Sequence, residues 1–112
     1  MEAVRREHDG ELCGHVVQQD GTWVATVVFG AVIGTHDTRE AAEAHVLRDG
    51  LAVLADRWTL RNLVTGADEI VCIQEAHPGS VTLALGYYSM PGVPTLTLTA
   101  DELAGGTWAL VR

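Results

Sequence analysis

One stretch of the sequence decides the fold of half the chain, residues 21–47, GTWVATVVFGAVIGTHDTREAAEAHVL. Asp20 and Gly21 form a two-residue hairpin signal, because both positions tolerate a positive φ angle. The strand predicted over 22–29 is rich in β-branched and aromatic residues, and Gly30 separates it from a short strand over 31–34. A helix is expected to begin at Asp37 or Thr38, since Glu40 stands at the capping-box position for Asp37. The stretch therefore predicts two further strands and a capped helix after the turn.

This helix is predicted to run over about 38–60 and to pack on one face of the sheet. Its apolar residues fall on one stripe at i, i+3 and i+4 spacing: Ala44, Leu47, Leu51, Leu54, Ala55 and Trp58. Gly50 lies inside the segment and costs about 1 kcal/mol relative to alanine in a helix. A kink or break at Asp49–Gly50 is therefore the alternative to the one long helix that we favour.

The rest of the chain predicts strands. Leu12–Gln19 precedes the hairpin turn, and residues 69–75, 81–88, 95–99 and 107–111 are rich in β-branched and aromatic side chains. Pro-Gly pairs typical of type II turns separate them. The predicted fold class is α+β, with antiparallel sheet of six to seven strands in all and the order β-β-β-α followed by a β-meander. A single domain is expected over 1–112, with residues 1–10 as a frayed polar leader.

Composition and charge narrow the classes of partner. The chain has 112 residues, and its 15 acidic residues against seven arginines leave a formal charge of −8. Such a surface repels polyanions and anionic membranes, so nucleic acid is an unlikely partner and no membrane association is expected. No apolar signal segment precedes residue 10, which predicts a cytoplasmic protein. The complete absence of lysine is typical of a genome rich in G and C, and indicates a bacterium or its phage.

No sequence pattern identifies a catalytic group, a metal centre or a cofactor. Cys13 and His15 stand two residues apart, so both are expected on one strand face, where they could begin a zinc or copper site. No second ligand pair accompanies them, and a packed cysteine beside a histidine is the preferred interpretation. His45 and Asp49 are spaced i, i+4 on the helix and are expected to form an exposed charge pair. We therefore predict no metal and no cofactor, and the sequence favours a non-enzymatic protein while leaving an enzyme open.

Residues 34–44 carry a resemblance. Residues 21–47 resemble the AP2 and integrase-arm type of DNA-binding module. The resemblance lies in a hairpin that contains Trp23, a Gly-Thr turn, and a helix that opens with Thr-Arg-Glu-Ala-Ala-Glu-Ala. The resemblance implies a β-β-β-α shape. It also implies DNA recognition by arginines and aromatic residues on the sheet, but residues 15–33 contain no arginine or lysine, and only His15 and Trp23 could serve. We therefore expect the β-β-β-α shape in this chain, but not the DNA-binding activity.

The preferred functional hypothesis is a small acidic binding protein, a regulator or inhibitor that acts by protein–protein contact. Tyr87, Tyr88 and Met90 cluster beside a Pro-Gly turn and supply candidate partner-binding anchors, because aromatic residues and methionine are enriched at interfaces. Asp101 and Glu102 would form an acidic rim that speeds association with a basic partner. One alternative is a degenerate AP2-like nucleic-acid-binding module. Another is a small enzyme or ligand-binding protein with a pocket between sheet and helix. The sequence leaves the identity of the partner and a homo-oligomer open.

Overall fold

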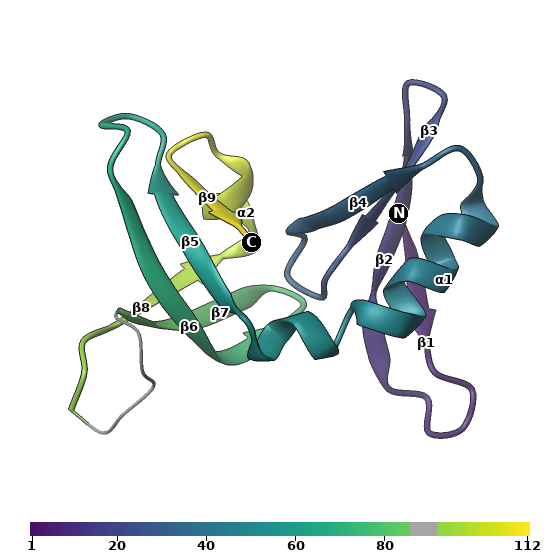
Figure 1. Cartoon of the computed structure of the whole chain (residues 1–112), viewed down its shortest axis with the longest axis horizontal. Coiled ribbons are helices and arrows are strands. Elements are labelled where there is room, and N and C mark those ends of the chain that lie inside the picture. The colour runs from purple at the N-terminus through teal and green to yellow at the C-terminus, as the bar shows by residue number, and fades with distance from the viewer. Residues whose placement is uncertain (86–91) are drawn as a thin grey trace. The chain divides into compact units, whose positions relative to one another are not determined.

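The computed structural model describes residues 1–85 and 92–112, and this part of the chain is α+β with antiparallel sheets, as predicted. It separates into two compact units, residues 1–53 and 54–112. Each unit has its own sheet, of four and five strands respectively (Figure 1), against the six to seven strands expected in all. The single domain remains a prediction. No helix among the described residues has the length and apolar composition needed to cross a membrane.

The N-terminal unit is a four-stranded meander covered by one helix. Its strands, in spatial and chain order, are β1 (Glu2–Arg5), β2 (Leu12–Gln19), β3 (Thr22–Thr26) and β4 (Val32–His36), followed by α1 (Arg39–Asp49). The predicted turn between β2 and β3 is present, with φ angles of 50° at Asp20 and 82° at Gly21. The expectation that residues 1–10 form a frayed leader is wrong for residues 2–5. These residues form strand β1, which pairs with β2 and buries Val4.

Helix α1 begins as predicted and ends early. The hydroxyl oxygen of Thr38 caps it by accepting a hydrogen bond from the backbone N–H of Ala41 at 3.2 Å. The helix stops at Asp49 instead of continuing to about residue 60, and a short 3₁₀ helix, η1 (Ala52–Ala55), precedes the next strand. This end is the break at Asp49–Gly50 that the sequence offered as the alternative to one long helix. A Cβ atom at Gly50 would collide with the carbonyl oxygens of Cys13 and Val46. The helix end approaches β2 so closely that only glycine fits.

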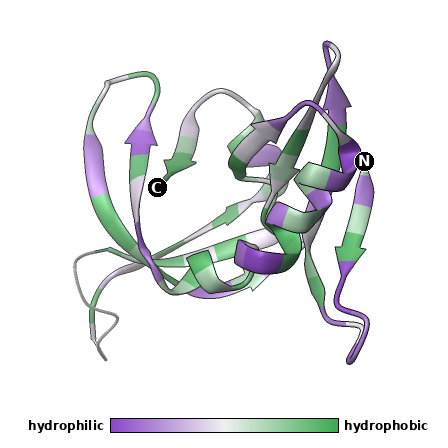
Figure 2. Ribbon diagram, turned by 45° about the vertical axis from the view of Figure 1, so that its right-hand side comes forward, coloured by the Kyte–Doolittle hydropathy of each residue, from purple (hydrophilic) through white to green (hydrophobic). Residues whose placement is uncertain are grey.

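The buried side of α1 also differs from the predicted stripe. A buried cluster joins the helix to the sheet: Val4, Cys13, Val16, Ala25, Ala42 and Val46. Ala44 and Leu47 are exposed instead of buried. The stripe was predicted for a helix that continues to Trp58. With the helix ending at Asp49, Ala42 and Val46 form the i, i+4 pair that faces the sheet. Hydrophilic and hydrophobic residues both occur along the helix (Figure 2).

The C-terminal unit is a five-stranded antiparallel sheet with the order β8-β7-β6-β5-β9. Its strands are β5 (Arg57–Asn62), β6 (Asp68–His77), β7 (Ser80–Leu85), β8 (Thr95–Thr99) and β9 (Trp108–Val111). A short helix, α2 (Ala100–Ala104), lies between β8 and β9. Trp58, expected at the end of a helix, is instead a buried residue of β5. The predicted meander is present in β6–β8, whereas β5 replaces the end of the predicted helix, and β9 pairs with β5 instead of with β8.

Candidate functional site

The predicted partner-binding residues fall into two groups. Tyr87, Tyr88 and Met90 lie outside the described residues, so their role remains a prediction. Asp101 and Glu102 belong to the first turn of α2. There a carboxylate oxygen of Glu102 accepts a hydrogen bond from the backbone N–H of Thr99 at 3.2 Å, and the Thr99 hydroxyl accepts one from the N–H of Glu102 at 3.1 Å. Glu102 therefore closes a capping box, whereas Asp101 is an exposed carboxylate.

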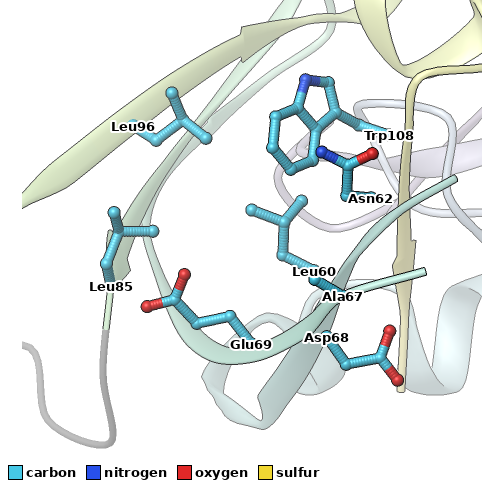
Figure 3. Close-up of a pocket in the computed structure, with 8 residues that line it drawn as sticks. All are labelled: Leu60, Asn62, Ala67, Asp68, Glu69, Leu85, Leu96 and Trp108. Carbon is cyan, nitrogen blue, oxygen red and sulfur yellow. The ribbon is translucent and has the colours of Figure 1, made fainter. Parts of the chain in front are cut away.

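The structure presents a pocket in the C-terminal unit that the sequence did not predict. Its volume is about 480 Å³, and its lining comes from all five strands and the loop before β6 (Figure 3): Leu60, Asn62, Ala67, Asp68, Glu69, Leu85, Leu96 and Trp108. The leucines and the indole make the walls mostly apolar. This volume lies within the roughly 300–1,000 Å³ range of small-ligand and side-chain sites. The pocket is therefore large enough to hold part of another molecule.

Strand pairing explains which side chains face the pocket. Residues directly opposite each other in antiparallel strands share a face, and Leu60 stands opposite Glu69 while Asn62 stands opposite Trp108. Because side chains alternate along a strand, Glu69 lies on the same face as the buried Val71. The carboxylate of Glu69 points into the space between Leu85 and Leu60 (Figure 3). The strand thus places a carboxylate on the apolar side of the sheet.

The two carboxylates at the pocket have different surroundings. Asp68 accepts hydrogen bonds from the guanidinium group of Arg61 at 2.9 and 3.2 Å, and this contact lowers the pKa of Asp68. The side chain of Glu69 makes no ion pair or hydrogen bond with residues 1–85 or 92–112. The negative charge of Asp68 is therefore compensated within the unit, while that of Glu69 is open to a ligand.

A structured turn borders the pocket between β5 and β6. The side-chain oxygen of Asn62 accepts hydrogen bonds from the backbone N–H groups of Val64 at 2.9 Å and Thr65 at 3.1 Å. Gly66, with a φ angle of 79°, completes the turn. Leu63 is 49% exposed and Val64 is 77% exposed at its tip. The turn therefore presents two apolar side chains to solvent between two pocket-lining residues, Asn62 and Ala67.

The N-terminal unit contains a hydrogen-bonded chain of three titratable side chains. His36 Nε2 on β4 lies 2.9 Å from His45 Nδ1 on α1, and the two rings meet edge to face with their centroids 5.1 Å apart. His45 Nε2 lies 3.3 Å from a carboxylate oxygen of Asp49, which is the predicted i, i+4 pair. At 14% exposure, the His45 side chain is more buried than expected for an exposed charge pair. The chain fixes α1 to β4 and depends on Gly34, where a Cβ atom would lie 2.7 Å from the His45 ring.

The expected common face for Cys13 and His15 is not found. The pairing of β1 with β2 shifts register between Val4 and Arg5, and Cys13 packs in the buried cluster with Val16. His15 precedes Val16 in regular strand structure and therefore points to the other face. Its Nδ1 atom is buried without a partner in the described chain, and this burial is the main cause that lowers the pKa of His15.

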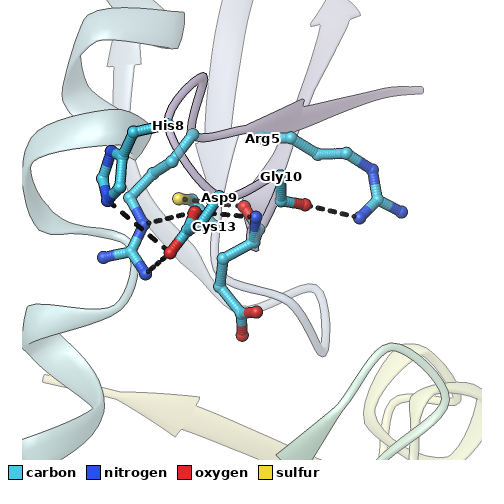
Figure 4. Close-up of polar contacts among 7 residues, drawn as sticks. Arg5, His8, Asp9, Gly10 and Cys13 are labelled. Atoms are coloured by element: carbon cyan, nitrogen blue, oxygen red, sulfur yellow. Dashed lines mark hydrogen bonds and ion pairs between the residues drawn. The ribbon is translucent and has the colours of Figure 1, made fainter.

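The turn between β1 and β2 is held by short-range polar contacts, several of which appear in Figure 4. A guanidinium nitrogen of Arg5 donates to the carbonyl oxygen of Gly10 at 3.1 Å, and the thiol of Cys13 donates to the carbonyl oxygen of Glu11 at 3.6 Å. Cys13 and Cys72 are both free thiols. Among the described residues, no group of three or more histidine, cysteine or acidic side chains is placed to share a metal ion.

Sequence reasoning missed the pocket because its residues are scattered from position 60 to position 108. The one local signal was an inverted pattern in β6, where Glu69 faces the apolar side and Ile70, at 38% exposure, faces outward. Comparison of the chain with protein-family models, with curated proteins and with solved structures finds no match.

Proposed function

We propose that this chain is a non-enzymatic binding protein, a regulator or inhibitor, and that its contact site is the pocket of the C-terminal unit. The observation that carries the proposal is the apolar pocket of about 480 Å³ beside a turn with exposed Leu63 and Val64. Interfaces combine a buried apolar centre with a polar rim. Leu60, Leu96 and Trp108 would supply such a centre, and Asn62 and Glu69 the polar groups.

Charge supports a protein partner over a nucleic acid. The formal charge of −8 opposes the approach of a polyanion, because nucleic-acid affinity depends on cations that neutralise phosphates. The same charge would speed association with a basic protein. Tyr87, Tyr88 and Met90 remain proposed partner-binding anchors.

The proposal is tested by capture of partners from a bacterial lysate with matched variants. Val64→Asp places a charge on the exposed turn beside the pocket, and Val32→Asp places the same charge on an exposed valine of the N-terminal unit. Both sites are exposed, so neither change should unfold the protein. We expect proteins captured by the wild type to be lost with Val64→Asp and retained with Val32→Asp.

Equal capture by both variants would contradict the proposed site. A parallel titration with labelled duplex DNA separates the nucleic-acid alternative. Binding at micromolar concentration that weakens steeply with salt would favour the degenerate AP2-like module instead.

A further inference from the structure

We infer that the pocket of the C-terminal unit receives an arginine or lysine side chain from a basic segment of the partner protein. This inference rests on the proposed function and goes further, because it names the chemical group that the pocket selects. It depends on the charge state of the pocket, on the chemistry of its walls and on its size.

The charge of the pocket is negative and uncompensated at one position. Arg61 neutralises Asp68, but Glu69 has no cationic partner within the described chain. A purely apolar occupant would cover the Glu69 carboxylate and remove its water without replacing it, which is unfavourable. An anionic occupant would be repelled. A cation that reaches Glu69 removes this cost, because charge-assisted hydrogen bonds replace the lost water.

The walls suit the stem of a long basic side chain. Arginine and lysine bury their methylene groups along apolar surface while the charged end keeps polar partners. Leu60, Leu96 and Trp108 offer this surface, and the indole ring also attracts a cation placed over its face. The side-chain oxygen of Asn62 is used by the turn, whereas its Nδ2 group donates no hydrogen bond within the described residues. That group is available to a backbone carbonyl of the bound segment.

The volume of the pocket is sufficient for one long side chain. At about 30 Å³ per water molecule in the liquid, the 480 Å³ pocket corresponds to roughly 16 waters. One arginine or lysine side chain with its adjoining backbone fits in this space. The exposed Leu63 and Val64 then contact the residues that flank the basic one.

The test uses capped pentapeptides, acetyl-Gly-Gly-Xaa-Gly-Gly-amide, titrated into the isotope-labelled full chain. Xaa is arginine, lysine, citrulline or norleucine, so that charge varies while the length of the side chain is nearly kept. Binding is followed by NMR at the indole N–H of Trp108, assigned with Trp108→Phe. We expect the arginine and lysine peptides to shift this signal, and the citrulline and norleucine peptides to bind at least about fivefold more weakly.

Glu69→Gln provides the residue-level test, because it removes the charge and keeps the shape. It should weaken the arginine peptide about fivefold and leave the citrulline peptide unchanged. Glu75→Gln is the matched control, since Glu75 is an exposed carboxylate on the same strand that does not line the pocket. It should have no effect. Free argininamide, added alone, should bind more weakly than the peptide if the flanking backbone contributes through Asn62 and the turn.

The outcomes separate the inference from the proposed function. If all four peptides shift Trp108 equally and Glu69→Gln changes nothing, the selection of a basic side chain is wrong while the pocket remains a contact site. If no peptide shifts Trp108 although capture still depends on Val64, the inference fails and the proposed function stands. If capture is also independent of Val64, both fail.

Discussion

Replacement of Gly34 by alanine tests the contact between β4 and α1. A Cβ atom on Gly34 would lie 2.7 Å from Cε1 and 2.8 Å from Nδ1 of His45, which is closer than van der Waals contact allows. The imidazole is 14% exposed and is held by His36 and Asp49, so it cannot yield by a small rotation. We therefore expect Gly34→Ala to displace the His45 ring and to break its contacts with His36 and Asp49.

The magnitude follows from what the ring loses. The hydrogen bond to His36 contributes about 1 kcal/mol, the partly exposed contact with Asp49 about 0.5 kcal/mol, and burial of the ring about 1 kcal/mol. Alanine in a strand returns about 0.5–1 kcal/mol relative to glycine. The free energy of unfolding of the N-terminal unit should fall by about 1.5–2 kcal/mol. This loss corresponds to about ten- to thirtyfold faster exchange of the most protected α1 amides.

Amide hydrogen exchange measured on the full chain provides the assay, because it reports on each unit separately. Gly79→Ala is the matched control, since a Cβ atom there meets nothing within 4 Å. The decisive comparison repeats Gly34→Ala in a His45→Ala background, where the obstructing ring is absent and the substitution should stabilise the unit by about 0.5–1 kcal/mol. The same cost in both backgrounds would refute the assignment of the clash to His45.

Two further predictions concern the core and the response to acid. Val46→Ala should destabilise the N-terminal unit by about 2 kcal/mol, because Val46 is fully buried. Leu47→Ala should cost less than about 0.5 kcal/mol, because Leu47 is exposed. If denaturant unfolding ranks the two variants in the opposite order, α1 presents its other side to the sheet. The hydrogen bond from Arg61 lowers the pKa of Asp68 below its ordinary 3.8. The ionised carboxylate therefore stabilises the folded state at pH values above 3.8. This contribution is lost as the pH falls through the lowered pKa of the folded state. When the solution is acidified below about pH 4, the β5 and β6 amides of Asp68→Asn should therefore lose less protection against hydrogen exchange than those of the wild type. If protection falls in parallel in the two proteins, the pair of Arg61 and Asp68 has no stabilising role.

Local features of the sequence were sufficient for several elements. Strands β2 (Leu12–Gln19) and β8 (Thr95–Thr99) have the predicted limits. A turn pair, Asp20–Gly21, follows β2, and threonine and leucine alternate along β8. Helix α1 starts where the sequence predicts, although Thr38 caps it and not Asp37. In these places neighbouring residues alone determine the structure.

The remaining features depend on contacts between distant residues. Gly50 marked the alternative end of the helix in the sequence, but its close approach to the backbone of Cys13 on β2 is a contact that no helical pattern contains. Strand β1 was not predicted, because charged residues surround Val4 in the sequence. Only the pairing of β1 with β2 buries this valine. The pocket needs Leu60, Glu69 and Trp108 to meet through strand pairing. Only the final sheet order brings these residues together.

The inward position of Glu69 also bears on misfolding. Four apolar residues, 70–73, follow it without alternation, so this part of β6 fits either face of the sheet. A slip of one residue would turn Ile70 inward and Glu69 outward, and would remove the pocket carboxylate while still burying apolar groups. The correct register therefore depends on the neighbouring strands and on the irregularity between Ile73 and Glu75, where β6 shifts against β7. The strand that supplies the binding charge is thus also the strand whose register its two neighbours, β5 and β7, must fix.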